Sequence, residues 1–262
     1  MPEGDTVWLS CRRLHAALAG RRLTRCEFRV PQLATTDLTG VTVLEVVSRG
    51  KHQLFRFDDA TTLHTHFRME GSWRVHAGGA RWTGGPAHQV RAVLGTADAV
   101  AVGYRLPVVE LLPTAEEPAV VGHLGPDLLG PDWDAGEALR RLSADPGRTV
   151  GEALLDQRNL AGIGTLYRAE LLFLSGVHPR APVRAVPDLA RLVARGQRLL
   201  LANRGRWEQS TTGDLRRGRE HWVFERPGRP CRRCGTPVRT EEFGPYGQER
   251  RSYWCPRCQP LR

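Results

Sequence analysis

Lysine is nearly missing from this chain of 262 residues. Lys51 is the single lysine among 38 basic side chains, and all the others are arginine. An ammonium is more compact than a guanidinium and loses its proton more readily when it is desolvated. Lys51 is therefore our first candidate for a reacting group, with a lysine left by chance as the alternative.

Long apolar segments are also missing. No run reaches the roughly 18 residues that a membrane-spanning helix needs. The polar, acidic start of residues 1–5 does not fit a secretory signal. We therefore expect a cytosolic protein without membrane contact.

Acidic residues are fewer than basic ones. Asp and Glu number 28 against 38 Lys and Arg, which gives a net charge of +10 and a pI of about 10.1. Nucleic acid is the commonest polyanionic partner of such a chain, although a basic surface or a ribosome-associated protein gives the same balance. The sequence shows no carboxylate constellation for Mg²⁺, which argues against a metal-dependent nuclease.

Only six cysteines occur, and four of them form two CxxC pairs. The pairs are separated by the 20 residues 235–254, and their members are Cys231, Cys234, Cys255 and Cys258. In a reducing compartment this spacing favours a metal over disulfides. We predict one structural Zn²⁺ in a closed tetrahedral site, with iron in the same cage as the alternative.

Hydrophobic periodicity divides the chain. Helical spacing of apolar residues predicts a helix over residues 5–19, and alternation then predicts antiparallel strands up to about residue 113. Helical patterns return later in the chain, over residues 135–142, 149–156, 165–175 and 187–203. Residues 205–218 are polar and rich in Gly, Arg and Thr, which predicts a mobile loop.

We therefore expect an α+β protein. An N-terminal helix and an antiparallel β-sandwich would occupy residues 1–115, followed by a linker rich in Pro, Gly and Asp over 116–134. A helical domain is expected over 135–224 and the four-cysteine zinc finger over 225–262.

The segment between the cysteine pairs carries both cations and aromatic rings. Arg250 and Arg251 stand beside Tyr253 and Trp254. This combination suits a finger that contacts phosphates or enters a groove. A solvated charged hairpin is the alternative.

Residues 152–170 predict two helices joined by a turn that contains Gly162 and Gly164. Glycines permit a positive φ, and N–H groups at a helix N-terminus bind phosphate well. The Asn159 amide can donate to a phosphate oxygen. An ordinary αα-corner is the alternative.

The N-terminus offers a nucleophile. Removal of the initiator methionine would expose the secondary amine of Pro2, which can attack the deoxyribose C1′ and form a cationic iminium. Glu3 can exchange protons with the sugar oxygen or the leaving base. On general grounds, a frayed terminus is the alternative.

Five motifs, taken together and in this order, resemble those of the formamidopyrimidine-DNA glycosylase and endonuclease VIII family, with endonuclease VIII the closer. They are the opening Met-Pro-Glu-Gly, the lysine segment, the His-Phe-Arg-Met segment, the glycine turn and the finger, at residues 1–4, 48–51, 66–69, 156–164 and 253–259. The resemblance implies a helix–two-turn–helix around the glycine turn and a catalytic N-terminal domain.

The resemblance implies a base-excision-repair DNA glycosylase with apurinic-site lyase activity. Pro2 would be the Schiff-base nucleophile and Glu3 the general acid/base. Lys51, on the strand after the Gly50 turn, would approach the damaged nucleotide. The protein would act as a monomer on damaged double-stranded DNA, without an organic cofactor, in the bacterial cytoplasm at the nucleoid.

The DNA contacts follow from the same resemblance. It implies phosphate ligands in His66 and Asn159 and at the turn glycines. Arg250 would grip the phosphates that flank the lesion, with Arg251 as the alternative by one residue. Arg68 and Met69 would fill the space of an everted base, where an apolar side chain replaces lost stacking.

Some family features are missing. Asp5 and Thr6 replace the Pro-Glu that many relatives carry after the glycine, and no Arg and Phe pair matches that of the oxidised-purine enzymes. Residues 205–218 are too short for a large lesion-capping flap. We therefore expect a preference for oxidised pyrimidines. An oxidised-purine preference and a catalytically silent damaged-DNA-binding protein remain alternatives, and β- versus β,δ-elimination stays open.

Overall fold

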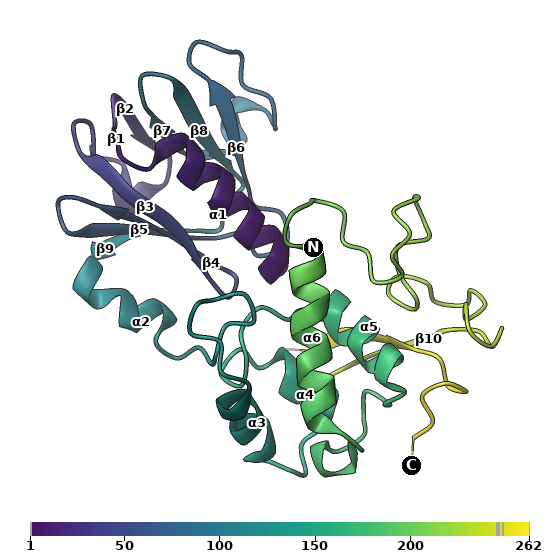
Figure 1. Ribbon diagram of the computed structural model, residues 1–262. Coiled ribbons are helices and arrows are strands. Elements are labelled where there is room, and N and C mark those ends of the chain that lie inside the picture. The colour runs from purple at the N-terminus through teal and green to yellow at the C-terminus, as the bar shows by residue number, and fades with distance from the viewer. Residues whose placement is uncertain (1, 245–246, 248, 262) are drawn as a thin grey trace. The chain divides into compact units, whose positions relative to one another are not determined.

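Figure 1 shows a computed structural model of the chain, in which all residues are described except 1, 245, 246, 248 and 262. Two compact units divide the chain, Met1–His123 and Leu124–Arg262. Among the described residues, no helix is both long and apolar enough to cross a membrane.

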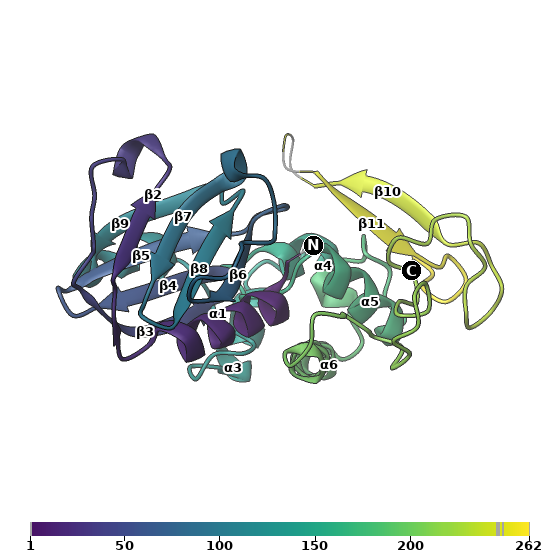
Figure 2. The ribbon, with the colours of Figure 1, turned by 90° about the horizontal axis from the view of Figure 1, so that it is seen from above.

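Helix α1 (Gly4–Leu18) and two antiparallel sheets make up most of unit 1 (Figure 2). One sheet has the strand order β1-β3-β4-β5-β9 and the other β2-β7-β8-β6. The strands are β1 (Arg21–Arg22), β2 (Arg25–Phe28), β3 (Thr42–Arg49), β4 (His52–Phe57), β5 (Thr61–His66), β6 (Ser72–Ala77), β7 (Val90–Gly95), β8 (Ala99–Tyr104) and β9 (Val108–Pro113). The predicted N-terminal helix and β-sandwich are confirmed.

A chain of buried polar groups joins both sheets to α1. The Trp73 Nε1 donates to Thr65 Oγ1 at 3.2 Å, and Thr65 donates to Gln53 Oε1 at 3.0 Å. Gln53 Nε2 then donates to Ser10 Oγ on α1 at 3.3 Å. Buried polar groups need such partners, so these bonds fix which residues of β5 face the interior.

Lys51 does not lie on a strand, and that expectation was wrong. It is the second residue of a two-residue turn that joins β3 to β4, where Arg49 pairs with His52. Gly50 comes first in the turn with φ +57, a conformation open to glycine without steric cost. The turn holds Lys51 at the very end of the hairpin.

Residues 116–134, predicted as a linker, carry regular structure and span the boundary between the units. Helix α2 (Glu117–Val121) is bound to β4, because Arg56 donates to both Glu117 carboxylate oxygens at 2.8 Å. Beyond the boundary, Leu128 belongs to the buried hydrophobic core of unit 2.

Unit 2 contains four longer helices and a hairpin. They are α3 (Ala135–Ser143), α4 (Val150–Leu155), α5 (Thr165–Ser175), α6 (Leu189–Asn203), β10 (Arg239–Phe243) and β11 (Arg250–Trp254). Asp134, Thr149 and Asp188 cap three of the helices by accepting backbone N–H groups. These helices match the four predicted helical patterns.

The buried carboxylate of Glu170 fastens the chain beyond α6 to α5. Its side chain has no exposed surface, and it accepts the backbone N–H groups of Trp222, Val223 and Phe224, each at 2.8 Å. The Thr211 hydroxyl donates to it as well. One side chain thereby satisfies three backbone donors of an irregular segment.

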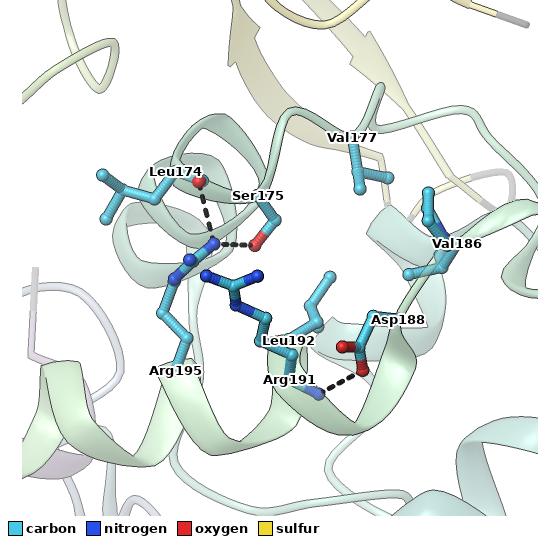
Figure 3. A pocket seen from close by; sticks show the side chains of 9 residues that line it. Leu174, Ser175, Val177, Val186, Asp188, Arg191, Leu192 and Arg195 are labelled. Carbon is cyan, nitrogen blue, oxygen red and sulfur yellow. Dashed lines mark hydrogen bonds between the residues drawn. The ribbon is translucent and has the colours of Figure 1, made fainter.

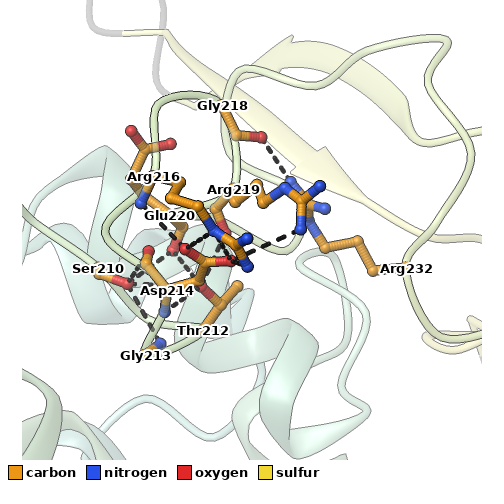
Figure 4. A network of polar contacts seen from close by, with 9 residues as sticks. All are labelled: Ser210, Thr212, Gly213, Asp214, Arg216, Gly218, Arg219, Glu220 and Arg232. Atoms are coloured by element: carbon orange, nitrogen blue, oxygen red, sulfur yellow. Dashed lines mark hydrogen bonds and ion pairs between the residues drawn. The ribbon is translucent and has the colours of Figure 1, made fainter.

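The predicted loop over 205–218 is a loop, and internal hydrogen bonds hold it together (Figure 4). Ser210 Oγ donates to the Asp214 carbonyl at 2.9 Å, and Arg216 donates to the Asp214 carboxylate at 2.7 Å. Arg232 of the following segment donates to the Gly218 carbonyl at 2.5 Å. Hydrogen bonds thus connect the loop internally and join it to the turn between Cys231 and Cys234.

Replacement of Glu170 tests this anchor. Glu170→Gln puts an amide group against three backbone donors, so the free energy of unfolding of unit 2 should fall by about 3 kcal/mol. Urea denaturation followed by tryptophan fluorescence measures it. The exposed Glu208→Gln is the matched control, and a Glu170 variant as stable as that control would contradict the assignment.

Candidate functional site

Pro2 and Glu3 belong to the folded part of unit 1. Pro2 is half-buried, and Glu3 occupies the N-cap position of α1 with no exposed surface. The helix itself is held to the sheet, since the Val46 N–H donates to His15 Nδ1 at 3.2 Å. The residue that follows Pro2 therefore carries its carboxylate in a buried surrounding at the start of α1.

Lys51 and His66 are brought together by the strand register. His52 pairs directly with His66, so the β3–β4 turn ends beside the end of β5. The ammonium of Lys51 contributes to lowering the pKa of His66, which is expected of a cation close to the ring. Lys51, which was predicted to approach the damaged nucleotide, thus lies close to the predicted phosphate ligand His66.

His66 presents a neutral ring. Burial, Lys51 and Arg68 lower its pKa to about 4. The backbone N–H of Arg68 donates to Nδ1 at 2.9 Å, so a neutral ring carries its proton on Nε2. At neutral pH His66 therefore offers one N–H donor, as a phosphate oxygen requires.

A tight turn exposes Met69. Arg68 has φ +47, which is uncommon for a residue with a side chain, and the Gly71 N–H donates to the Phe67 carbonyl at 2.9 Å. A Cβ at Gly71 would approach that carbonyl oxygen to 2.8 Å. The side chain of Met69 is 63% exposed at the tip. The turn thus holds Arg68 in a sparsely populated conformation and leaves Met69 accessible to a partner.

The glycine turn between α4 and α5 is organised by Gln157, which the sequence analysis did not single out. Its amide nitrogen donates to the Leu155 and Ile163 carbonyls at 2.8 and 2.9 Å, and its oxygen accepts the Gly162 N–H at 3.0 Å. Gly162 has φ +112, as expected for a glycine turn. Its N–H is already engaged, so a phosphate would have to displace Gln157 to use it.

Two further residues of this turn were predicted to contact phosphate, Asn159 and Gly164. Asn159 is half-buried and donates to the Ala153 carbonyl at 2.9 Å, and an amide nitrogen carries a second hydrogen for a phosphate. Gly164 is the buried N-cap of α5 with φ −126, so it does not need glycine's left-handed freedom. At Gly125, which packs on the turn, a Cβ would lie 2.6 Å from the Asn159 carbonyl oxygen.

The four predicted metal ligands converge. The sulfur atoms of Cys231, Cys234, Cys255 and Cys258 all lie within 4.8 Å of one another. The Cys231–Cys258 and Cys234–Cys255 sulfur distances are 3.9 and 3.4 Å. Sulfurs about 2.3 Å from a tetrahedral centre are separated by about 3.8 Å. The cluster can therefore hold one metal ion.

Arg250 and Arg251, the two neighbouring arginines of β11, have different partners. Arg251 forms an ion pair with Glu242 at 2.9 Å, and this carboxylate raises the pKa of Arg251. Arg250 donates to the Glu249 carbonyl instead. The buried Arg168 of α5 donates to the Arg251 carbonyl at 2.7 Å and so fixes this strand on the helix.

Unit 2 also contains a cavity of about 300 Å³ (Figure 3). Arg195 lines it and donates to the Leu174 carbonyl and Ser175 Oγ, both at 2.8 Å. None of the predicted site residues lines this cavity.

Four histidines of unit 1 form a cluster that residue spacing alone did not predict. His52, His64 and His66 lie on β4 and β5 close to His123, and His64 is hydrogen-bonded to Glu110 at 2.9 Å. Alternation places residues 64 and 66 on one face of β5. That spacing was visible in the sequence, but the pairing with β4 and β9 was not.

Comparisons with known proteins agree with these features. The family models "Formamidopyrimidine-DNA glycosylase N-terminal domain" and "Formamidopyrimidine-DNA glycosylase H2TH domain" match residues 1–105 and 124–198. A solved structure of Lactococcus lactis formamidopyrimidine-DNA glycosylase bound to DNA with an abasic site has a TM-score of 0.80 at 24% identity, covering 99% of this chain and 100% of that one. This likeness shows a shared fold.

Several other proteins share a higher sequence identity with this chain. "Probable endonuclease 8 2" of Streptomyces coelicolor is 60% identical over 99% of this chain and 94% of its own length. "DNA-(apurinic or apyrimidinic site) lyase Nei2" of Mycolicibacterium smegmatis is 49% identical over 99% of both chains. "Endonuclease 8" of Escherichia coli is 33% identical over 99% of this chain and 100% of its own. The chain therefore belongs to the formamidopyrimidine-DNA glycosylase and endonuclease VIII family of base-excision-repair glycosylases and apurinic-site lyases, on its endonuclease VIII side.

Proposed function

We propose that this protein removes oxidised bases, preferentially pyrimidines, from damaged double-stranded DNA through a Schiff base on Pro2 and then nicks the strand. The observation that carries the proposal is the fixed N-terminus. The residue that supplies a secondary amine adjoins a fully buried carboxylate, Glu3, at the start of α1. A merely flexible chain end would not bury that acid.

The reaction begins once the initiator methionine has been removed. The Pro2 nitrogen forms a bond to C1′, the bond from C1′ to the base breaks, and the base leaves with a proton. Glu3 is the group placed to exchange protons with the sugar oxygen or the leaving base. The Pro2 nitrogen gives up its proton, and protonation of the sugar ring oxygen breaks the bond from C1′ to that oxygen, which opens the ring to an iminium. The iminium accepts electrons when a C2′ proton is removed, and the bond from C3′ to the phosphate oxygen then breaks, so the phosphate leaves.

Donors in both units would bind the phosphates. In unit 1 these are the Lys51 ammonium and the His66 Nε2–H. In unit 2 they are the Asn159 amide and Arg250, whose guanidinium pairs with a carbonyl while that of Arg251 pairs with Glu242. Charge-assisted bonds from such groups to phosphate are shorter and stronger than neutral ones.

The exposed Met69 is the candidate wedge for the space that an everted base leaves. Eversion costs a few kcal/mol of stacking, which an apolar side chain partly replaces. The preference for oxidised pyrimidines is supported by the loop over 205–218. Because its polar groups bond to each other and to Arg232, it offers little free chain for a lesion-capping flap.

We further propose that the metal is one structural Zn²⁺. Four cysteine sulfurs at nearly tetrahedral spacing leave no open coordination position, so the ion would stabilise the finger and take no part in the reaction. When bound, it fixes both turns that hold the β10–β11 hairpin and hence the position of Arg250.

Metal analysis tests the zinc proposal. Purified protein should contain one zinc per chain, and Cys258→Ser should lose the metal, because three thiolates no longer close the site. Cys26→Ser is the matched control, since Cys26 lies outside the cluster and should keep one zinc. Stoichiometric iron in native protein, or zinc retained by the cluster variant, would contradict the proposal.

Borohydride trapping tests the imine. Untagged protein mixed with a duplex that carries one abasic site should give a covalent adduct on the Pro2 amine. Protein with an uncleaved N-terminal extension should bind the duplex without forming the adduct. An adduct on Lys51 would reassign the nucleophile, and no adduct from zinc-loaded protein would favour the silent DNA-binding alternative.

Base-removal rates of the same untagged protein test the substrate preference. In single-turnover reactions, duplexes with one oxidised pyrimidine should lose the base faster than matched duplexes with one oxidised purine. The extended protein, which lacks the free amine, is the control for both. A faster reaction on the purine duplex would replace the proposed preference and leave the imine chemistry intact.

A pair of neighbouring variants tests the finger. Arg250→Ala should weaken binding to an abasic-site duplex and lower the slope of log Kd against log salt by about one, because one phosphate contact is lost. Arg251→Ala is the matched control and should change the slope less, since Glu242 already pairs with it. Fluorescence anisotropy over several salt concentrations measures both slopes. A larger loss for Arg251→Ala would move the phosphate contact to that residue.

A further inference from the structure

Four histidines and one carboxylate gather on one face of the five-stranded sheet in unit 1. His52 stands on β4, His64 and His66 on β5, and Glu110 on β9, while His123 follows α2. The ring centroids of His52 and His64 are 5.1 Å apart, and those of His52 and His66 are 4.8 Å apart. The face is opposite to Thr65, whose hydroxyl is bonded inside the unit.

Hydrogen bonds connect three of these groups in a row. Glu110 Oε2 lies 2.9 Å from His64 Nδ1, and His64 Nε2 lies 2.9 Å from His52 Nδ1. A carboxylate only accepts, so His64 Nδ1 carries a proton. In a neutral His64, Nε2 is then an acceptor, and His52 must donate from its Nδ1. The carboxylate thereby determines the tautomers of two rings.

The position of the ring proton in His66 is determined by a backbone hydrogen bond. Its Nδ1 accepts the Arg68 N–H, so its proton lies on Nε2. Its ring meets that of His52 edge to face, with an interplanar angle of 79°. His52 therefore supports the ring of His66 from the side, while a backbone bond holds the other edge of that ring.

The charges around the cluster explain why His52 has to be neutral. Around His52 lie His66, His64, His123 and Lys51 from the β3–β4 turn. Around His66 lie Lys51, His64 and Arg68 from the turn after β5, and Glu110 on β9 is the acid at His64. Burial, the neighbouring histidines and Lys51 lower the pKa of His52 to about 3. A proton on His52 would add a partly desolvated cation beside Lys51.

We propose that Glu110, His64 and His52 form a relay that positions His66 and Lys51 for phosphate binding. Glu110 acts through His64 to orient His52 as a neutral ring, and His52 in turn supports the His66 ring that offers its Nε2–H. None of the three touches DNA in this scheme, so all are positioning residues. The inference rests on the proposed role of His66 and Lys51 as phosphate ligands.

The first test is spectroscopic and needs no DNA. In the ¹⁵N-labelled full-length protein at pH 7, long-range ¹H–¹⁵N spectra should show His64 and His52 protonated on Nδ1 and His66 on Nε2. Glu110→Leu should convert His64 to a mixture of tautomers. Glu110→Gln keeps an acceptor oxygen and should retain the native pattern.

The second test is binding to a duplex with a stable abasic-site analogue. Glu110→Leu should weaken binding about 3- to 10-fold, as expected for the loss of one hydrogen bond in the relay, and Glu110→Gln should remain within about twofold. Loss of one negative charge should by itself strengthen DNA binding. Glu116→Leu, which removes an exposed acid before α2, measures that opposite effect.

The outcomes separate the two proposals. A native His64 protonated on Nε2 alone, or on both nitrogens, would overturn the relay whatever the binding data show. Correct tautomers with unchanged affinity in Glu110→Leu would overturn the positioning role. Failure of the native protein to form the borohydride adduct would instead contradict the proposed function. Thermal unfolding of each variant shows whether a loss of affinity reflects a loss of fold.

Discussion

The carboxylate of Glu170 is the constraint on which the C-terminal half of unit 2 depends. It is fully buried in α5 and accepts three consecutive backbone N–H groups, so the irregular chain after α6 has one fixed path. Two other bonds tie the finger to the same helix region. Arg168 donates to the Arg251 carbonyl, and Gln259 donates to the Val177 carbonyl at 2.8 Å. The metal cluster and the hairpin therefore take their places from one helix.

In unit 1, buried hydrogen bonds likewise fix the position of a strand, β5. Thr65 is bonded inside the unit through Gln53 and Trp73, and alternation along β5 then turns His64 and His66 to the other face. A slip of one residue would exchange those faces and break the interior bonds. The interior of the unit thus fixes the groups that we assign to phosphate binding and to its support.

Several features could be predicted from the sequence because they depend on local spacing. Helices α3 to α6 follow from periodicity, and the metal cluster follows from two CxxC pairs, since a metal ion needs only four sulfurs at one point. Other features could not. The turn position of Lys51 depends on where the β3–β4 pairing ends, and the use of the Gly162 N–H depends on the Gln157 side chain. Neither the end of a strand pairing nor a single side-chain hydrogen bond produces a periodic pattern in the sequence.

The sequence by itself determined the chemistry that is available: one lysine, a proline behind the initiator methionine, four cysteines in two CxxC pairs and an excess of arginine. These are properties of residue type and spacing, and folding does not alter them. Only the tertiary structure decided which groups meet. The register of β4, β5 and β9 joins Glu110 to His52 through His64, and the β10–β11 pairing places Arg251 opposite Glu242 and Arg250 opposite Phe243. Contacts between residues far apart in the chain arise from packing, which spacing along the sequence does not encode.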